Sequence, residues 1–177
     1  MDISFRLMTK GDLPLVSNWQ MSPEVHQWYG KDNVDTAQIE NRYREKMEQI
    51  PRLTRHFIIR LDGTDAGMIQ AYMLNSYPDF NCFVQMDENT AMVDVFLAPK
   101  FMHKGYGSDV MRAFLKNYVF SGRLFVADKC AIGPEPKNLS AIRMYEKAGF
   151  HWLKTIQIPD EDAPEYIMII DRETIMG

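Results

Sequence analysis

Hydrophobic and polar residues recur along this chain with two periods that predict strands and helices. Alternation with a period of two predicts a strand over residues 3–8. Two more strands are predicted within residues 54–74, joined by a hairpin turn at Asp62 and Gly63. Helical spacing predicts four helices, over residues 9–20, 34–50, 108–120 and 138–149. Two of these have clear apolar faces, formed by Ile39, Tyr43, Met47 and Ile50 in one, and by Met111, Phe114, Leu115 and Tyr118 in the other.

The rest of the chain adds further predicted strands, so that strands and helices are mixed along the sequence. Residues 91–98 and 123–132 read as strands, and residues 150–158 and 165–171 form a last hairpin around an acidic loop. Asn138 has the side chain of a helix N-cap, and Gly149 is suited to end the same helix. No repeat, low-complexity tract or linker interrupts this order. We therefore expect one mixed α/β domain over residues 1–177.

Composition and charge narrow the class of protein. The chain has 177 residues, 46% of them hydrophobic, which suits a globular domain with a sizeable core. Its net charge of −4 argues against a nucleic-acid partner and leaves room for a cationic one. Cys82 and Cys130 lack metal-ligand spacing and are expected to be reduced thiols. Neither a secretory signal nor a membrane span is predicted, so we expect a cytoplasmic protein.

The segment HKGYGS, residues 103–108, lies between a predicted strand and a predicted helix. Gly105 and Gly107 allow a backbone in which successive N–H groups point the same way. A helix beginning near Ser108 would add its unpaired N–H groups and the positive end of its dipole. This combination suits a phosphate or pyrophosphate, although two glycines alone are more typical of a flexible strand-to-helix turn. The segment has neither the Walker spacing nor the Rossmann spacing of glycines.

The segment PKNLSAIRMYEKAGF, residues 136–150, gives the glycine loop a context. Together with MHKGYG at 102–107 it resembles the GNAT superfamily of acetyl-CoA-dependent N-acetyltransferases. The resemblance implies the GNAT fold, a mostly antiparallel mixed sheet that is splayed at an acetyl-CoA cleft and flanked by helices. It also implies acetyl-CoA as the acetyl donor, with no metal.

The resemblance implies roles for several residues in and near the two segments. The loop would bind the CoA pyrophosphate through backbone N–H groups, Asn138 would hold the pantetheine arm, and Tyr145 would protonate the departing thiolate. A backbone N–H near Phe96 or Leu97 would polarise the acetyl carbonyl. At the first loop position the family often has Arg or Gln, and this chain has Met102. The implied cofactor-binding residues are Phe96, Leu97, Met102, His103, Lys104, Gly105, Tyr106, Gly107, Ser108 and Asn138.

Within the superfamily, nearly the whole chain is similar to the aminoglycoside 6′-N-acetyltransferases. VDVFLAP places Asp94 where that branch has an aspartate that contacts the amino sugar and could be its base. An unpaired carboxylate within this apolar strand would be costly, which favours a function for it. A polycationic amine needs carboxylates, because each ammonium favours a charged partner. The implied substrate-binding residues are Trp28, Tyr29, Asp79, Asp94, Glu135 and Asp160, with Gly30 completing the pocket segment WYG.

Two departures and several alternatives remain. The branch often has an aspartate where this chain has Gly133, a role that Glu135 could take, and the acidic loop over 159–165 is longer than expected. Other possible functions are acetylation of a hydroxylysine-like siderophore precursor, acetylation of a protein N-terminus, or acyl-CoA sensing without catalysis. The chain's histidines have no metal spacing and no assigned role; they are His26, His56, His103 and His151.

Overall fold

A computed structural model describes residues 1–29, 34–159 and 161–177 of the chain. These residues form two compact units, the first made of Met1–Gln70 and Asp94–Tyr106 and the second of Ala71–Val93 and Gly107–Gly177. Strands β3 (Thr64–Met73) and β4 (Thr90–Leu97) contribute residues to both units. The strands follow the hydrogen-bonded order β1-β2-β3-β4-β5-β7-β6, and the expected mixed, mostly antiparallel sheet of the GNAT fold is confirmed.

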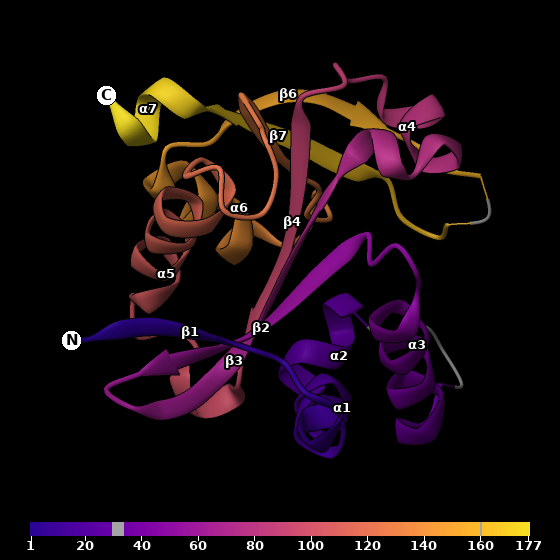
Figure 1. Cartoon of the computed structure of the whole chain (residues 1–177), viewed down its shortest axis with the longest axis vertical. Helices are drawn as coiled ribbons and strands as arrows, with labels where there is room; N and C mark the ends of the chain where they lie inside the picture. Colours follow the sequence, from indigo (N-terminus) through magenta and orange to yellow (C-terminus); the bar gives the residue numbers. More distant parts are fainter. Residues whose placement is uncertain (30–33, 160) are drawn as a thin grey trace. The chain divides into compact units, whose positions relative to one another are not determined.

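The first unit contains β1 (Ile3–Leu7), β2 (Thr54–Leu61) and three helices. β1 pairs antiparallel with β2, with Ile3 opposite Leu61. Helix α1 (Leu13–Met21) packs against α2 (Pro23–Tyr29) and α3 (Thr36–Glu48), as Figure 1 shows. The predicted hairpin turn between β2 and β3 is confirmed, because Asp62 and Gly63 have φ angles of 47° and 77°.

Apolar side chains from the helices and strands of the first unit form one core. The buried members are Met8, Leu13, Val16, Val25, Ile58, Met68 and Phe96. Tyr43 and Met47 of α3 pack against this core, as their helical spacing predicts. The prediction for Ile50 was wrong: it is 95% exposed because α3 ends at Glu48, before the apolar face reaches it.

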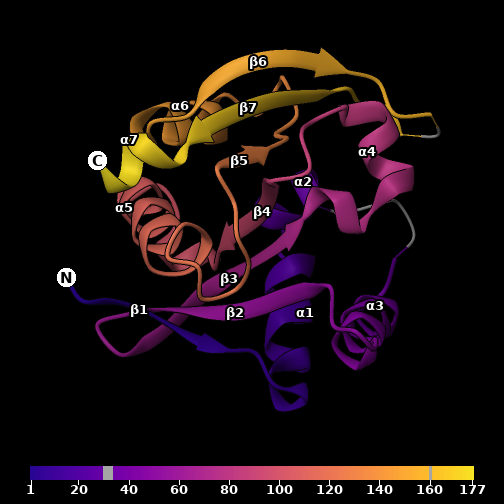
Figure 2. The same cartoon turned by 45° about the horizontal axis from the view of Figure 1, so that its top comes forward.

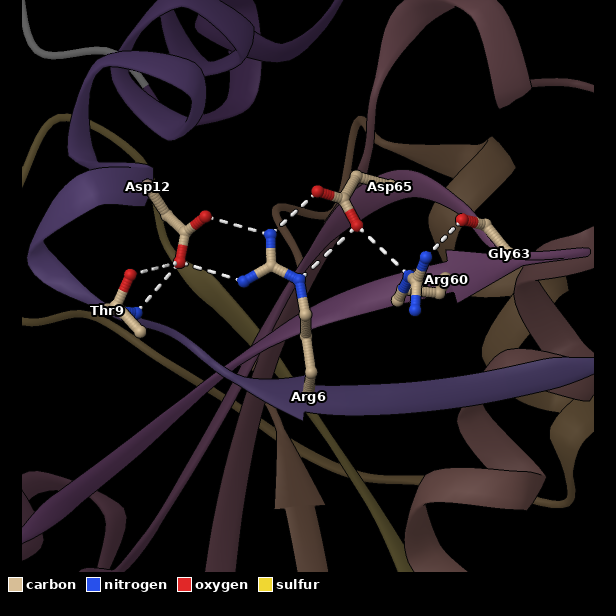
Figure 3. A network of polar contacts seen from close by, with 6 residues as sticks. All are labelled: Arg6, Thr9, Asp12, Arg60, Gly63 and Asp65. Atoms are coloured by element: carbon tan, nitrogen blue, oxygen red, sulfur yellow. Dashed lines mark hydrogen bonds and ion pairs between the residues drawn. The ribbon is translucent and has the colours of Figure 1, made fainter.

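A half-buried group of charged side chains joins β1, β3 and the turn before α1 (Figure 3). Arg6 donates to both oxygens of Asp12, at 2.9 and 2.8 Å, and to both oxygens of Asp65, at 3.4 and 2.6 Å. The Asp12 carboxylate also accepts from the backbone N–H and the hydroxyl of Thr9. Arg60 forms an ion pair with Asp65 and donates to the carbonyl of Gly63. We call these residues the Arg6 cluster.

The second unit contains β5 (Lys129–Ile132), β6 (His151–Ile156) and β7 (Glu165–Asp171), with four helices. β5 pairs parallel with β4, placing Thr90 opposite Lys129, and antiparallel with β7. β6 and β7 run side by side as an antiparallel hairpin (Figure 2). The helices are α4 (Pro78–Val84), α5 (Tyr106–Phe114), which continues as a π-helical turn over Leu115–Val119, α6 (Leu139–Ala148) and α7 (Arg172–Met176).

Several predicted boundaries in the second unit need correction. The strand predicted over residues 123–132 covers only Lys129–Ile132. Helix α4 was not predicted at all, because its seven residues are too few to show helical spacing. The helix predicted from Ser108 begins two residues earlier, at Tyr106. Three members of its predicted apolar stripe, Met111, Phe114 and Leu115, are fully buried, and Tyr118 is partly buried.

Candidate active site

Asp94 lies on β4 in the first unit and is held by a neighbouring strand. Its Oδ2 accepts a hydrogen bond of 2.7 Å from Nε2 of Gln70, which lies on β3. Burial raises the pKa of Asp94, and the Gln70 hydrogen bond and the charge of Lys46 partly oppose that rise. A carboxylate with a raised pKa and a part of its surface exposed is suited to exchange a proton.

Tyr29, at the end of α2, fastens the backbone of β4 beside Asp94. Its hydroxyl donates to the carbonyl of Val95 at 2.7 Å and accepts from the Val95 N–H at 3.1 Å. The Tyr29 ring also meets Phe96 edge-on, with the ring centroids 5.4 Å apart. The Tyr29 hydroxyl therefore orients β4, a role that the sequence did not suggest. Trp28 lies in the same helical turn and is partly exposed, whereas Gly30 falls outside the described residues.

Gly67 on β3 allows β4 to approach unusually closely at the position of the expected carbonyl-polarising N–H. A Cβ at this position would lie 2.3 Å from the Phe96 carbonyl oxygen and 2.8 Å from the Cα of Leu97. Real Cβ atoms are not found at such distances from backbone, so residue 67 must be glycine for β4 to keep this path. Sequence reasoning missed this residue, since a glycine within a strand shows no partner until the pairing is known.

Two further polar side chains of the first unit, Tyr43 and His56, interact with Asp94 or Gln70 electrostatically. Tyr43 of α3 donates from its hydroxyl to Oε1 of Gln20 at 3.0 Å, and its ring meets the His56 imidazole edge-on at 5.5 Å. The pKa of Tyr43 is raised by burial and further by the charge of Asp94. His56 is fully buried, and burial lowers its pKa to about 3. We call Tyr43, His56, Gln70 and Asp94 the Asp94 cluster.

Only one of the two loop glycines has the special backbone angles that the sequence predicts, because Gly107 already lies within α5. His103 and Gly105 both have left-handed φ angles, of 57° and 84°. A Cβ at Gly105 would meet no heavy atom within 4 Å, so the surrounding space is open. Helix α5 then begins at Tyr106. Met102 packs against the apolar core of the first unit, and Lys104 is exposed.

Gly107 and Ser108 belong to the first turn of α5, in the second unit. A Cβ at Gly107 would lie 2.8 Å from Cγ of Met144 on α6, so this glycine serves the contact between the two helices. The Ser108 hydroxyl is buried and has no hydrogen-bond partner among the described residues. A buried hydroxyl without a partner is costly, which makes it a candidate to bind a ligand.

Helix α6 carries both residues expected from the second motif. The Asn138 side-chain oxygen accepts from the Ala141 N–H at 3.1 Å, which confirms its predicted N-cap. Gly149 ends the helix with a φ of 110°, as predicted. Tyr145 is 5% exposed, and its ring meets Phe150 edge-on at 5.9 Å. Packing therefore fixes the Tyr145 ring in the second unit.

The remaining predicted acids lie in the second unit or outside the described residues. Asp79 is exposed in the first turn of α4, Glu135 is partly exposed, and Asp160 is not described. Beside Gly133, the carboxylate of Glu165 fills the side-chain position: a Cβ at residue 133 would lie 2.3 Å from Oε2 of Glu165. At residue 133, where the related branch often has an aspartate, the nearest carboxylate thus belongs to Glu165 of β7.

A separate polar recess of about 350 Å³ lies in the second unit and contains none of the predicted site residues. An ion pair of 2.7 Å between Lys129 and Asp87 neutralises part of its charge. Its lining residues are Asp87, Glu88, Asn89, Thr90, Asp128 and Lys129. Across residues 1–29, 34–159 and 161–177, no cluster of potential ligands could hold a metal ion. In the same ranges, no helix has the length and apolarity needed to cross a bilayer.

Comparisons with known proteins agree with these features. Residues 9–158 match the acetyltransferase (GNAT) domain family. The chain is 28% identical over 174 residues to an aminoglycoside N(6′)-acetyltransferase type 1 of Klebsiella pneumoniae, covering 97% of this chain and 84% of that protein.

Solved structures show the same likeness. A structure of AAC(6′)-Ib with paromomycin and acetyl-CoA superposes with a TM-score of 0.84 at 27% identity, covering 98% of this chain and 95% of that one. A complex of AAC(6′)-Ib with coenzyme A and kanamycin gives a TM-score of 0.83 at 26% identity, covering 97% and 96%. This chain belongs to the GNAT acetyltransferase family.

Proposed function

We propose that this protein transfers an acetyl group from acetyl-CoA to the 6′-amine of an aminoglycoside, and that residues 1–177 act as one domain. The family match spans residues of both compact units, which supports a single domain. The similarity to aminoglycoside acetyltransferases extends over nearly the whole chain. Asp94 carries the proposal, because its carboxylate is desolvated, oriented by Gln70 and still partly exposed.

The residues of the loop and of α5 fit acetyl-CoA. The left-handed turn at His103 and Gly105 leaves open space beside the backbone, and the N-terminus of α5 presents N–H groups to an anion. The unpartnered Ser108 hydroxyl, in the first turn of α5, is a further donor proposed for the cofactor. Asn138 uses its oxygen for the helix cap, so a pantetheine arm would bind its amide nitrogen. When bound, acetyl-CoA supplies the acetyl group as a thioester.

Three groups of this chain would then carry out the transfer. Asp94 would hold the substrate ammonium and accept its proton, directly or through water. A backbone N–H near Phe96 or Leu97 would polarise the acetyl carbonyl, on a strand whose path Gly67 and Tyr29 hold in place. Tyr145 would give its phenolic proton to the leaving sulfur.

A polycationic substrate needs further acids besides Asp94. Asp79, Glu135 and Asp160 are proposed to bind ring ammonium groups, and the position of Glu165 beside Gly133 adds it to this set. Trp28 and Tyr29 are proposed to contact the sugar through their rings. Among those acids that the structure describes, Glu165 is the one whose carboxylate lies where a side chain at residue 133 would be.

One observation favours a second candidate substrate, an amine that also carries a carboxylate. Nε and Nη2 of Arg52 are buried and lack a hydrogen-bond partner among the described residues. Burial and the nearby Arg55 lower the pKa of Arg52. The charge of Arg52 in turn lowers the pKa of His56, so this cation lies near the Asp94 cluster. A hydroxylysine-like amino acid would pair its carboxylate with such an arginine.

A substrate screen decides between these functions. Release of CoA from acetyl-CoA is measured with kanamycin, tobramycin, amikacin, spermidine and hydroxylysine, and bacteria expressing the protein are tested for kanamycin resistance. We expect turnover with the aminoglycosides and resistance in the cells. Turnover with hydroxylysine alone would favour the second candidate. Absence of turnover with every amine would contradict both.

A further inference from the structure

Asp94 receives a hydrogen bond from a side chain to which no role in catalysis is assigned. Gln70 Nε2 lies 2.7 Å from Asp94 Oδ2, a short distance that is typical of donation to a charged oxygen. Gln70 is only 9% exposed, so this bond is shielded from competing water. One carboxylate oxygen is therefore fixed, which sets the direction of the other.

The other end of the Gln70 amide faces a buried group of complementary chemistry. Oε1 of Gln70 and both ring nitrogens of His56 are buried, and none makes a hydrogen bond of normal geometry within the described chain. The Gln70 side chain, as an acceptor close to the imidazole, nevertheless raises the pKa of His56, although burial lowers that pKa far more. A neutral imidazole has one N–H donor, and Gln70 Oε1 is the acceptor at hand. Donation from His56 would keep the amide oriented with its nitrogen toward Asp94.

We propose that Gln70 is a positioning residue for Asp94, oriented in turn by His56, which fixes the carboxylate toward the acceptor amine and favours its ionised form. The inference rests on the proposed function of Asp94. It adds two residues, on β3 and β2, that do not contact the substrate themselves but set the geometry and charge of the residue that does.

Other charged and titratable groups also face this site, so a test must distinguish the effect of Gln70 on Asp94 from theirs. From α3, the charge of Lys46 favours ionised Asp94, and Tyr43 interacts with the Asp94 charge. Beside β2, Arg52 affects His56. None of these groups donates to Asp94 through a hydrogen bond among the described residues, in contrast to Gln70. Removing the Gln70 donor should therefore raise the pKa of Asp94 and leave the other influences in place.

The test compares Gln70→Met with Gln20→Met. Gln20 is a second buried glutamine of the first unit, but it bonds to Tyr43 and to the Tyr29 carbonyl and not to Asp94. For Gln70→Met we expect kcat/KM at neutral pH to fall about tenfold, because a hydrogen bond to a charged group is lost. The acidic limb of its pH profile should move to higher pH, with the KM for acetyl-CoA unchanged. Gln20→Met should leave the acidic limb in place.

Two further measurements keep the test decisive. His56→Phe keeps a ring against Tyr43 and removes the N–H donor, so it should shift the acidic limb in the same direction but less. Carbon-13 NMR titration of the Asp94 carboxyl, without substrate, should show the same order of pKa values in folded variants. The proposal would be overturned if neither Gln70→Met nor His56→Phe shifted the acidic limb and the Asp94 pKa measured by NMR. It would also be overturned if Gln20→Met shifted them as much as Gln70→Met does. A wild type without turnover would overturn the proposed function, while the NMR titration would still decide whether Gln70 sets the ionisation of Asp94.

Discussion

The first unit contains two polar clusters whose groups are paired in opposite ways. In the Arg6 cluster, one guanidinium meets two carboxylates and each carboxylate has more than one donor (Figure 3). In the Asp94 cluster, a single amide donates to the carboxylate, and buried atoms of Gln70 and His56 remain without partners in the described chain. The first cluster lies at the half-exposed end of β1, and the second lies among buried strands and α3.

The pKa shifts of the two aspartates follow from this difference. The Arg6 guanidinium and the Thr9 donors lower the pKa of Asp12 to about 2, against a smaller effect of burial. Burial raises the pKa of Asp94 because its single donor and the charge of Lys46 offset only part of the cost. A fully paired carboxylate stabilises the fold and stays ionised, whereas an underpaired one can exchange a proton. Within one unit, Asp12 is thus suited to a structural role and Asp94 to the catalytic role proposed for it.

The largest effect is expected for Asp94→Asn, which keeps the shape of the side chain and removes its charge and basicity. We expect kcat/KM for kanamycin to fall at least about a hundredfold, or about 2.7 kcal/mol of transition-state stabilisation. The free energy of unfolding should stay the same or rise, because a desolvated charge is removed. Steady-state kinetics and urea unfolding measure both. As a control, Asp79→Asn should act mainly on the KM for the drug; full activity of Asp94→Asn would refute its role.

Tyr145→Phe tests the proton donor proposed in the second unit. The ring contact with Phe150 should survive, so acetyl-CoA binding and stability are expected to change little. Loss of the proton donor should lower kcat about a hundredfold, at the low end of general acid catalysis, because water can replace part of its function. Single-turnover kinetics would report the chemical step, and an unchanged rate there would make Tyr145 a packing residue only.

Gly67→Ala tests whether the close approach of β3 and β4 supports the Asp94 cluster. The added Cβ would collide with the Phe96 carbonyl, and we expect the free energy of unfolding to fall by about 2–3 kcal/mol. The matched control is Gly11→Ala, since a Cβ there would be 3.6 Å from Oγ1 of Thr9, an ordinary contact. Thermal unfolding of both variants gives the answer, and equal melting temperatures would show that β4 can move aside.

Asp12→Asn is expected to have the smallest effect, and only on stability. The pKa of Asp12 is lower in the folded state than in the unfolded one, so its contribution is complete above about pH 4 and is lost as pH falls toward about 2. We expect the variant to lose about 1 kcal/mol at pH 7, since Arg6 is partly exposed to solvent. The difference from wild type should shrink between those pH values in urea titrations, with kcat/KM unaffected at pH 7. A constant difference would assign the loss to packing.

Local signals in the sequence predicted the elements that depend on a few adjacent residues. Asp62 with Gly63 specified a turn, and Asn138 with Gly149 specified both ends of α6. The long helices followed from their spacing. Prediction failed where the element was short, as for α4, or where tertiary pairing limited it, as for β5. In the candidate site, Asp94 could likewise be predicted from adjacent residues, because it is an acid within an apolar strand.

The partners of Asp94 could not be predicted, because they come from strands whose pairing the sequence does not state. Gln70 and Gly67 are ordinary strand residues until β3 is placed beside β4. Glu165 is 32 positions from Gly133 along the chain, by subtraction of the residue numbers, yet its carboxylate fills the space beside that glycine. These contacts depend on the fold, and any comparison by aligned position alone would miss them.

His56 also provides the protein with an internal spectroscopic probe. The chain has four histidines, and His56 is the one that is fully buried, whereas His103 and His151 are exposed and His26 is partly so. The edge-on ring of Tyr43 should displace the His56 proton resonances through its ring current. Its low pKa keeps those resonances from titrating across the neutral range. One resolved signal in a simple proton spectrum would then report on the packing of His56 against Tyr43, without any label.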